Sequence, residues 1–257
     1  MAGFLAGLVG IGGGVVFVPV LLQMLEAGGL APTWVPRVAV ATSLAVIQVT
    51  LLVSGYTHWK LGNMRVKALP GLVLAGVIGS LLASLALGLV TAAPFKVVLG
   101  LFQIYLGSRL WAAPKHGGQG QAGSARFIAI GGVAGWISGF FGVGGGLIVM
   151  PLLHLGAGFS LPHAVGTATG FMIFSVAAGL SSYVIQGWNL NLGQPGLWGL
   201  IHLPALLALL PTAMVFSRLG AQTSSKLNAN RLRRGFGLLV AVLGLWSVAQ
   251  GLGRLLA

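Results

Sequence analysis

Long apolar stretches alternate with short polar connections along the whole chain. Six stretches are continuous, and each approaches the length of about 20 apolar residues that a helix needs to cross a bilayer. They cover residues 38–58, 68–90, 95–112, 163–185, 197–217 and 234–253. Two further apolar segments, residues 2–25 and 126–157, are interrupted by runs of glycine. The pattern predicts an all-α polytopic membrane protein that combines full transmembrane helices with two broken helical segments.

The two broken segments share one motif. Residues 10–14 read Gly-Ile-Gly-Gly-Gly and precede Pro19, whereas residues 142–146 read Gly-Val-Gly-Gly-Gly and precede Pro151. At this offset of 132, nine of the 21 positions in residues 2–22 are identical. The following spans align as well, because both carry a Thr-containing run near their start. We therefore expect a first repeat in residues 1–112 and a second repeat in residues 126–257, joined by a flexible cytoplasmic linker in residues 113–125.

Composition narrows the class of protein. Hydrophobic residues make up 56% of the chain and charged residues only 6%, against roughly 25% charged residues in a soluble domain. The net charge is +13, and Glu26 is the only acidic residue. In a membrane protein such basic residues orient loops and meet anionic lipids, so we expect lipid contacts and no nucleic-acid partner. The absence of cysteine excludes disulfides, thiolate chemistry and cysteine-ligated metals.

The basic residues also predict how the segments cross the membrane. If both broken segments crossed it fully, the 14 Lys and Arg residues would divide seven and seven between the two sides. If each segment enters and returns on one side, eleven share a face: Lys60, Arg65, Lys67, Arg109, Lys115, Arg126, Arg218, Lys226, Arg231, Arg233 and Arg234. Arg37, Lys96 and Arg254 lie on the other. Cytoplasmic loops carry such an excess, which favours two re-entrant hairpins and basic cytoplasmic loops.

The same charges favour inverted repeats. The loop at 59–67 holds three positive charges and its counterpart at 186–196 holds none, as expected if each half makes an odd number of crossings. Each repeat would contain one re-entrant hairpin and three transmembrane helices. A hairpin arm of roughly 10–12 residues spans about 15–18 Å, which reaches the middle of a ~30 Å hydrocarbon core. Two tips that enter from opposite faces would therefore meet near the midplane. Cysteine labels at Gly158 and Asn191 test this, because full crossings would place 191 inside and 158 outside.

The glycine tips of the hairpins are candidate anion sites. A helix begins after each run, its first N–H groups lack intrahelical partners, and its dipole is positive toward the tip. Glycine also lets the backbone approach a ligand and adopt positive φ. Close helix packing is the alternative, which the spacing Gly135-xxx-Gly139 favours. The expected substrate-binding residues are Gly12, Gly13, Gly14, Thr42, Ser43, Gln48, Gly144, Gly145, Gly146, Thr167 and Thr169.

The hydroxyls and the amide in that set sit in the spans that follow the hairpins. Hydroxyls donate to anion oxygens without bringing charge into the membrane, although they often bond to carbonyls of their own helix instead. Gln48 lies deeper in its span and needs a polar partner there. Arg37, on the less basic side, either attracts anions to the entrance or anchors a helix end. Glu26 is expected in a loop, so no carboxylate relay is predicted within the membrane.

The doubled Gly-x-Gly-Gly-Gly…Pro motif, with Ala-Thr-Ser at 41–43 and Gly-Thr-Ala at 166–168, resembles the sulfite exporter family of the TauE/SafE type. The resemblance covers nearly the whole chain, both halves included. It implies a secondary transporter of the bacterial inner membrane that exports sulfite or a small organosulfonate. The glycine tips and the hydroxyls independently indicate that the substrate is an anion.

The prediction is therefore a secondary anion transporter that works by alternating access around a midplane site. An anion channel, or an accessory membrane subunit that needs a partner protein, remains the alternative. An enzyme is not expected, because the chain has no Cys nucleophile and no predicted intramembrane Asp or Glu. No cofactor or metal is predicted. The partners are a small anionic substrate and membrane lipids, with a homodimer left open.

Overall fold

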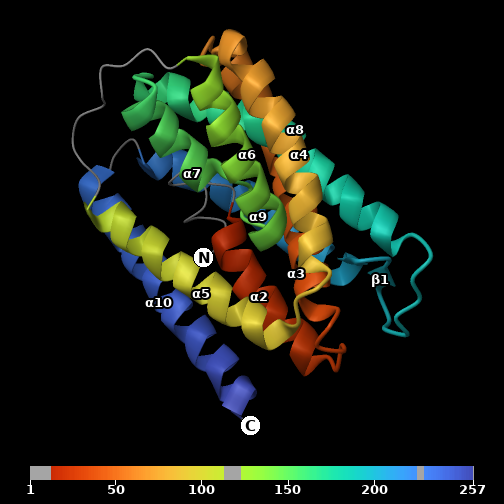
Figure 1. Ribbon diagram of the computed structural model, residues 1–257. Helices are drawn as coiled ribbons and strands as arrows, with labels where there is room; N and C mark the ends of the chain where they lie inside the picture. Colours follow the sequence, from red (N-terminus) through yellow and green to blue (C-terminus); the bar gives the residue numbers. More distant parts are fainter. Residues whose placement is uncertain (1–12, 113–122, 225–228, 257) are drawn as a thin grey trace.

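The structure, a computed structural model, describes residues 13–112, 123–224 and 229–256 (Figure 1). Within these ranges the chain is helical apart from one short hairpin. The first half contains α2 (Gly14–Ala27), α3 (Val35–Lys60), η1 (Val66–Ala68), α4 (Leu69–Leu87) and α5 (Ala92–Ala112). The second contains α6 (Ser124–Phe141), α7 (Gly146–Pro151), η2 (Leu152–Gly156), α8 (Leu161–Gly187), β1 (Leu197–Trp198), β2 (Ile201–His202), α9 (Leu203–Ser224) and α10 (Ala229–Leu256). The predicted Gly12 and most of the predicted linker lie outside the described residues.

Five helices in the described part of the chain are long and apolar enough to cross a membrane. They are α3, η1 with α4, α6, α8, and residues 234–256 of α10. Shorter apolar helices occupy residues 14–27 and 146–156. The expectation of an all-helical, multi-pass membrane protein is confirmed. The predicted spans at 95–112 and 197–217 also fold as the helices α5 and α9, although neither is among the five.

Two boundaries differ from the sequence prediction. The arm before the second glycine run is α6, with 18 residues rather than 10–12. At 1.5 Å per residue it spans about 27 Å. The span predicted from residue 197 begins at Leu203 instead, because β1 and β2 form an antiparallel turn before it. Gly196, just before β1, and Gly199, between the two strands, have φ values of +82° and +57°. Neither helix nor strand continues through a residue with positive φ.

The helices α3 and α8 form the centre of the molecule. Their most apolar windows are 67% and 56% buried, the two largest shares among the five long apolar helices. Gly55, near the end of α3, packs on Ile173, whereas Leu44, near its start, packs on Gly179. Because the earlier residue of one helix meets the later residue of the other, α3 and α8 run antiparallel.

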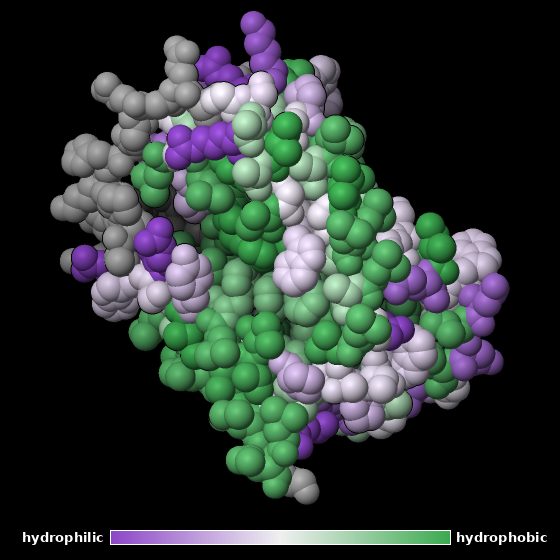
Figure 2. Space-filling view, viewed as in Figure 1, coloured by the Kyte–Doolittle hydropathy of each residue, from purple (hydrophilic) through white to green (hydrophobic). Residues whose placement is uncertain are grey.

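The helices α5 and α10 form a second antiparallel pair, which lies side by side at the left of Figure 1. A methyl group on Gly100 would lie 2.5 Å from the carbonyl oxygen of Gly244, and one on Gly107 would lie 2.6 Å from that of Gly237. The backbones therefore touch at glycines seven residues apart on each helix. The outer face of the pair is almost continuously hydrophobic (Figure 2), as expected for a surface that contacts lipid.

The helices α4 and α6 pack in parallel through small residues. Gly131 lies against Leu72, Gly135 against Gly76, and Gly139 against Ser80. The numerical difference is 59 in all three pairs, so the helices keep one register over two turns. This is the small-xxx-small mode of packing in membranes. The packing explanation that the sequence offered for Gly135 and Gly139 is therefore correct.

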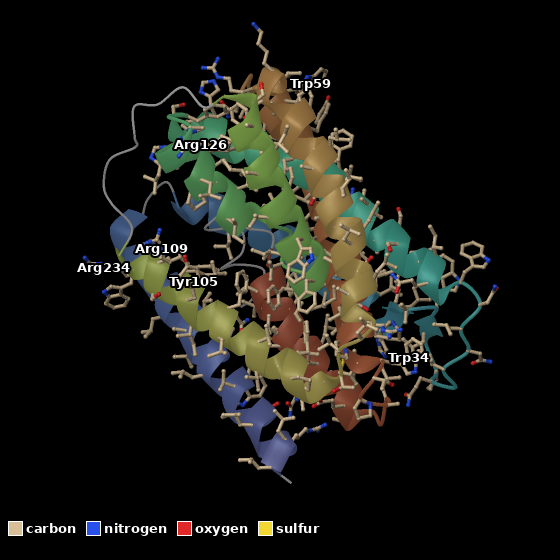
Figure 3. The ribbon with its side chains drawn as sticks, viewed as in Figure 1. Trp34, Trp59, Tyr105, Arg109, Arg126 and Arg234 are labelled. Carbon is tan, nitrogen blue, oxygen red and sulfur yellow. The ribbon has the colours of Figure 1, made fainter. Side chains whose placement is uncertain are left out.

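Among the side chains that the structure describes, the lysines and arginines separate onto two ends of the bundle. One end, called here the basic face, carries Lys60, Arg65, Lys67, Arg109, Arg126 and Arg234 at helix ends or in connections. Figure 3 labels three of these arginines and Trp59 toward this end, with Trp34 near the opposite one. Arg37, Lys96 and Arg254 lie at that opposite end, called here the Glu26 face. The separation matches the asymmetry that the sequence predicted.

Candidate functional site

The two glycine runs meet inside the bundle. Gly14 begins α2, and a methyl group on it would lie 2.3 Å from the carbonyl oxygen of Gly142 and 2.7 Å from Cα of Val143. The second run also packs on the central helices, because Gly142 contacts Val40 and Gly146 contacts Met172. The two segments, far apart in the chain, thus bring their tips into backbone contact. We call this contact the tip junction, formed by residues 13–14 and 142–146.

The backbone of the tip junction depends on glycine. Gly13 and Gly145 precede α2 and α7 with φ values of +72° and +76°, and Gly144 has φ +81°. Residues other than glycine rarely adopt this backbone conformation. No side chain caps either helix. Gly13 O accepts from Val16 N–H and Phe17 N–H at 3.0 and 3.1 Å, and the earlier N–H groups of the first turn have no acceptor within the helix.

Gln103 of α5 is a polar residue at this junction that the sequence prediction missed. Its Nε2 donates to the carbonyl oxygen of Val15 at 2.7 Å, and the side chain is fully buried. The carbonyl needs an outside donor because its helical partner would be the N–H of Pro19, which proline lacks. The adjacent Phe102 stacks on Phe141, directly before the second tip, with ring centroids 4.5 Å apart. A proline inside α2 was the available indication that a donor would be needed there.

Replacement of Gln103 by Leu tests this bond. The Val15 carbonyl would lose its donor in a buried site, which is expected to destabilise the fold by about 1–3 kcal/mol. Pro19→Ala supplies a backbone N–H to the same carbonyl, so Gln103→Leu should cost clearly less in that background. Thermal unfolding of the parent, both single variants and the double variant in detergent measures the coupling. Strictly additive effects would contradict the assignment.

The four predicted hydroxyls are all buried, and each has a protein partner. Ser43 Oγ donates to the carbonyl oxygen of Gly142 at 2.8 Å and so belongs to the tip junction. Thr169 Oγ1 donates to Val165 O of its own helix at 2.9 Å, the alternative that the sequence left open. The structure therefore brings Ser43, but not Thr169, into hydrogen-bond contact with a glycine tip.

Thr42 and Thr167 make a reciprocal pair of contacts between the halves. Thr42 Oγ1 accepts from the backbone N–H of His202, just before α9. Thr167 Oγ1 accepts from the N–H of Arg65, just before η1 and α4. Both bonds are 3.0 Å long. Each threonine of a central helix therefore holds the start of a helix in the opposite half, while its own hydroxyl proton stays available for donation.

His202 has a second role at the start of α9. Its Nδ1 accepts from the N–H of Ala205 at 3.1 Å, which satisfies one of the free donors of the first turn. Burial lowers the pKa of His202, partly offset by a hydrogen bond to its own backbone. The imidazole is therefore neutral at neutral pH, as an accepting nitrogen requires.

Gln48 lies next to a residue that packs on the tip junction, whereas Arg37 lies at the Glu26 face. Gln48 Oε1 is buried without a hydrogen-bond partner, on the helix next to Ile47, which packs against Gly14 and Gly144. Arg37 donates to the carbonyl oxygen of Gly88 at the end of α4, and its guanidinium lies 4.6 Å from the ring centre of Trp34. These contacts match the anchoring alternative for Arg37.

The expectation that Glu26 lies in a loop is wrong. Glu26 lies in the last turn of α2, its side chain is only 4% exposed, and it pairs with Lys96 and Arg254. The sequence did indicate that Glu26 would be paired, because it is the single acidic residue in a chain with net charge +13 and a buried carboxylate needs cations nearby. No group of three metal-ligating side chains occurs among the described residues.

Several long apolar helices, two interrupted apolar segments and a polar junction inside the bundle define a multi-pass membrane protein with the architecture of a transporter. The chain matches the family described as Sulfite exporter TauE/SafE over residues 1–247. It therefore belongs to the TauE/SafE sulfite exporter family and is a membrane transporter rather than an enzyme.

Individual relatives agree with this assignment. A probable membrane transporter protein of Haemophilus influenzae is 30% identical over 250 residues, which cover 95% of this chain and 93% of the relative. The probable membrane transporter protein YunE of Bacillus subtilis is 27% identical over 274 residues, covering 98% and 95%. No solved structure matches the chain.

Proposed function

We propose that the protein is a secondary transporter that exports sulfite or a small organosulfonate anion by alternating access. The tip junction is the observation that carries the proposal. The N-terminus of α2, which has no side-chain cap, contacts Gly142 and Val143 there, and the N-terminus of α7, also without a side-chain cap, follows at Gly146. Backbone N–H groups bind oxyanions without bringing a positive side chain into the membrane. The family name supports sulfite or a related sulfur oxyanion as the substrate.

Substrate binding in this proposal uses the backbone of Gly12, Gly13, Gly14, Gly144, Gly145 and Gly146, and the side chains of Thr42, Ser43, Gln48, Thr167 and Thr169. Ser43 is the side chain that lies at the tip junction, where its hydroxyl donates to the carbonyl of Gly142 and would turn to donate to a bound anion instead. Thr42 and Thr167 hold the starts of opposing helices, so we assign them a further part in coupling the halves. The backbone contact between the tips represents an occluded state, which opens when one half moves against the other.

We also propose that the halves are inverted repeats, each containing a re-entrant hairpin. The antiparallel packing of α3 on α8 and of α5 on α10 supports this, since these helices occupy equivalent places in the two halves. The second hairpin is supported by Gly156, at the end of η2, where a methyl group would lie 3.1 Å from Nη2 of Arg126 at the start of α6. Both ends of the segment thus reach the basic face. The cysteine labelling at 158 and 191 tests the arrangement.

The proposed location is the bacterial inner membrane, with the basic face in the cytoplasm. The Glu26 face then forms the exit side. An anion that leaves the cytoplasm moves down the membrane potential, which supplies about 2.3 kcal/mol per charge at 100 mV. Export without a further coupling ion is therefore energetically favourable.

Flux from proteoliposomes that contain only this protein tests the proposal. Sulfite, sulfoacetate and taurine are compared with sulfate and chloride, and we expect saturable movement of sulfite or a sulfonate. Thr169→Val tests a hydroxyl more cleanly than a change at Thr42 or Thr167, because the hydroxyl of Thr169 accepts no hydrogen bond from a backbone N–H group. Loss of one hydrogen bond to an anion should slow transport about tenfold. Thr169→Ser keeps a hydroxyl at the same position and is the matched control.

The outcomes separate the alternatives. Full activity in Thr169→Val would keep the transporter and remove Thr169 from the site. Unitary currents in planar bilayers would identify a channel instead. A folded protein that moves none of these anions would contradict the proposed function and favour an accessory subunit.

A further inference from the structure

The only carboxylate side chain of the protein is buried between two cations on the Glu26 face. Glu26 Oε2 accepts a hydrogen bond from Lys96 Nζ of α5 and forms an ion pair with Arg254 Nη2 of α10, at 3.1 Å. Lys96 also donates to Gln250 Oε1 at 3.0 Å. The side chains of Glu26 and Lys96 are 4% and 3% exposed, and that of Arg254 is 50% exposed. We call these four residues the Glu26 cluster.

The Glu26 cluster carries an uncompensated positive charge. Two cations meet one carboxylate, and the sequence contains no other acidic residue that could neutralise the second. Lys96 is buried and paired with Glu26, so the excess charge lies with Arg254, whose side chain is half exposed and open to a further anion. Only one carboxylate oxygen of Glu26 has partners, because Oε1 is buried without a hydrogen bond. An incoming oxyanion therefore has to replace the contacts of one oxygen only.

The position of the cluster links it to the proposed substrate path. Glu26 lies at the end of α2, and Gly14 at the tip junction begins the same helix. The helix has 14 residues and spans about 21 Å. Lys96 and Arg254 belong to the α5–α10 pair, whose glycine contacts hold the two helices together. The cluster thus ties the helix of the first tip to that pair on the side opposite the basic face.

We propose that Lys96, Arg254 and Gln250 form a second binding site for a small oxyanion on the exit side, and that Glu26 occupies it in this conformation. A sulfite or sulfonate oxygen can accept the charge-assisted hydrogen bond of Lys96 and pair with Arg254 in the place of Oε2 of Glu26. The arriving anion displaces the carboxylate and releases α2 from α5 and α10. This inference rests on the proposed function for the identity of the anion and for the direction of travel.

Equilibrium binding of radiolabelled sulfite to the full chain in detergent tests the site. Glu26→Gln keeps the size of the side chain and removes the competing charge. We expect it to bind one more sulfite per chain than the parent, or to bind sulfite about tenfold more tightly. Lys96→Met added to Glu26→Gln should abolish the gain. Glu26→Asp, which keeps a carboxylate, is the control.

A second measurement needs no variant. Glu26 is the only carboxyl side chain, so carbodiimide coupling read by mass spectrometry reports its accessibility directly. Sulfite should raise the labelling of Glu26 in the parent, whereas sodium chloride at equal ionic strength should not.

The inference is overturned if Glu26→Gln, shown to be folded, binds sulfite as the parent does. It is also overturned if sulfite leaves the labelling of Glu26 unchanged. Failure of the proposed function has a different signature, namely absence of flux in proteoliposomes whatever the binding result.

Discussion

Gly14→Ala is expected to lower the rate of anion transport about 100-fold or more. The added methyl group would lie 2.3 Å from the carbonyl oxygen of Gly142 and 2.7 Å from Cα of Val143. Both atoms belong to the backbone, so the clash cannot be relieved by a change of rotamer, and the tips must separate by roughly 1 Å. Displacements of that size cost about 100-fold where function depends on positioned groups. The initial rate of sulfite efflux, normalised to folded protein, measures the effect.

Gly253→Ala is the matched control, because no atom lies within 4 Å of the added methyl group. It should transport like the parent. If Gly14→Ala retained a rate within about threefold of the parent, the close backbone contact would be unnecessary for transport. The tip junction would then lose its place as the substrate site.

Gly135→Ala is expected to cause a large loss of stability. Its methyl group would lie 2.1 Å from the carbonyl oxygen of Gly76 and 2.6 Å from Cα of the same residue. The helices α6 and α4 are already in backbone contact there, so they must move apart along the parallel interface. Overpacking of this kind costs about 1–3 kcal/mol, which lowers the unfolding midpoint by several degrees.

Gly132→Ala lies on the same helix and provides the comparison. The nearest atom to its methyl group is Cβ of Ala75 at 3.8 Å, an ordinary van der Waals contact. Thermal unfolding in one detergent should show a lower midpoint for Gly135→Ala and little change for Gly132→Ala. Equal midpoints for the two variants would mean that α4 and α6 are not held by this contact.

The glycine motif illustrates how far the sequence could lead. The repeated Gly-x-Gly-Gly-Gly run predicted a broken helix and backbone with positive φ, and Gly13, Gly144 and Gly145 have such backbone. It also predicted that the tips would meet, as Gly14 and Gly142 do. The positive φ follows from local chemistry, because few residues other than glycine tolerate such backbone. The length of the arm did not follow in this way, since α6 has 18 residues rather than 10–12.

The partners of the polar residues could not be predicted in the same way. Ser43 and Thr42 are adjacent, yet one donates to Gly142 and the other accepts from His202. A helix turns by about 100° per residue, so neighbours face different surroundings that are set by helices distant in the chain. Likewise, Gln103 became recognisable only when α5 was placed beside the carbonyl that Pro19 leaves free.

The sequence by itself determined that this is a multi-pass membrane protein of the TauE/SafE type, with two glycine-broken segments and an uneven distribution of basic residues. Composition, the lengths of the apolar stretches and the repeated glycine motif can be read from the sequence without knowing which helices become neighbours. Only the tertiary structure decided that Glu26 is buried between Lys96 and Arg254 and that α4 packs in parallel on α6. Such pairings depend on which helices become neighbours, and in a bilayer that choice rests on shape and buried polar contacts rather than on hydrophobicity.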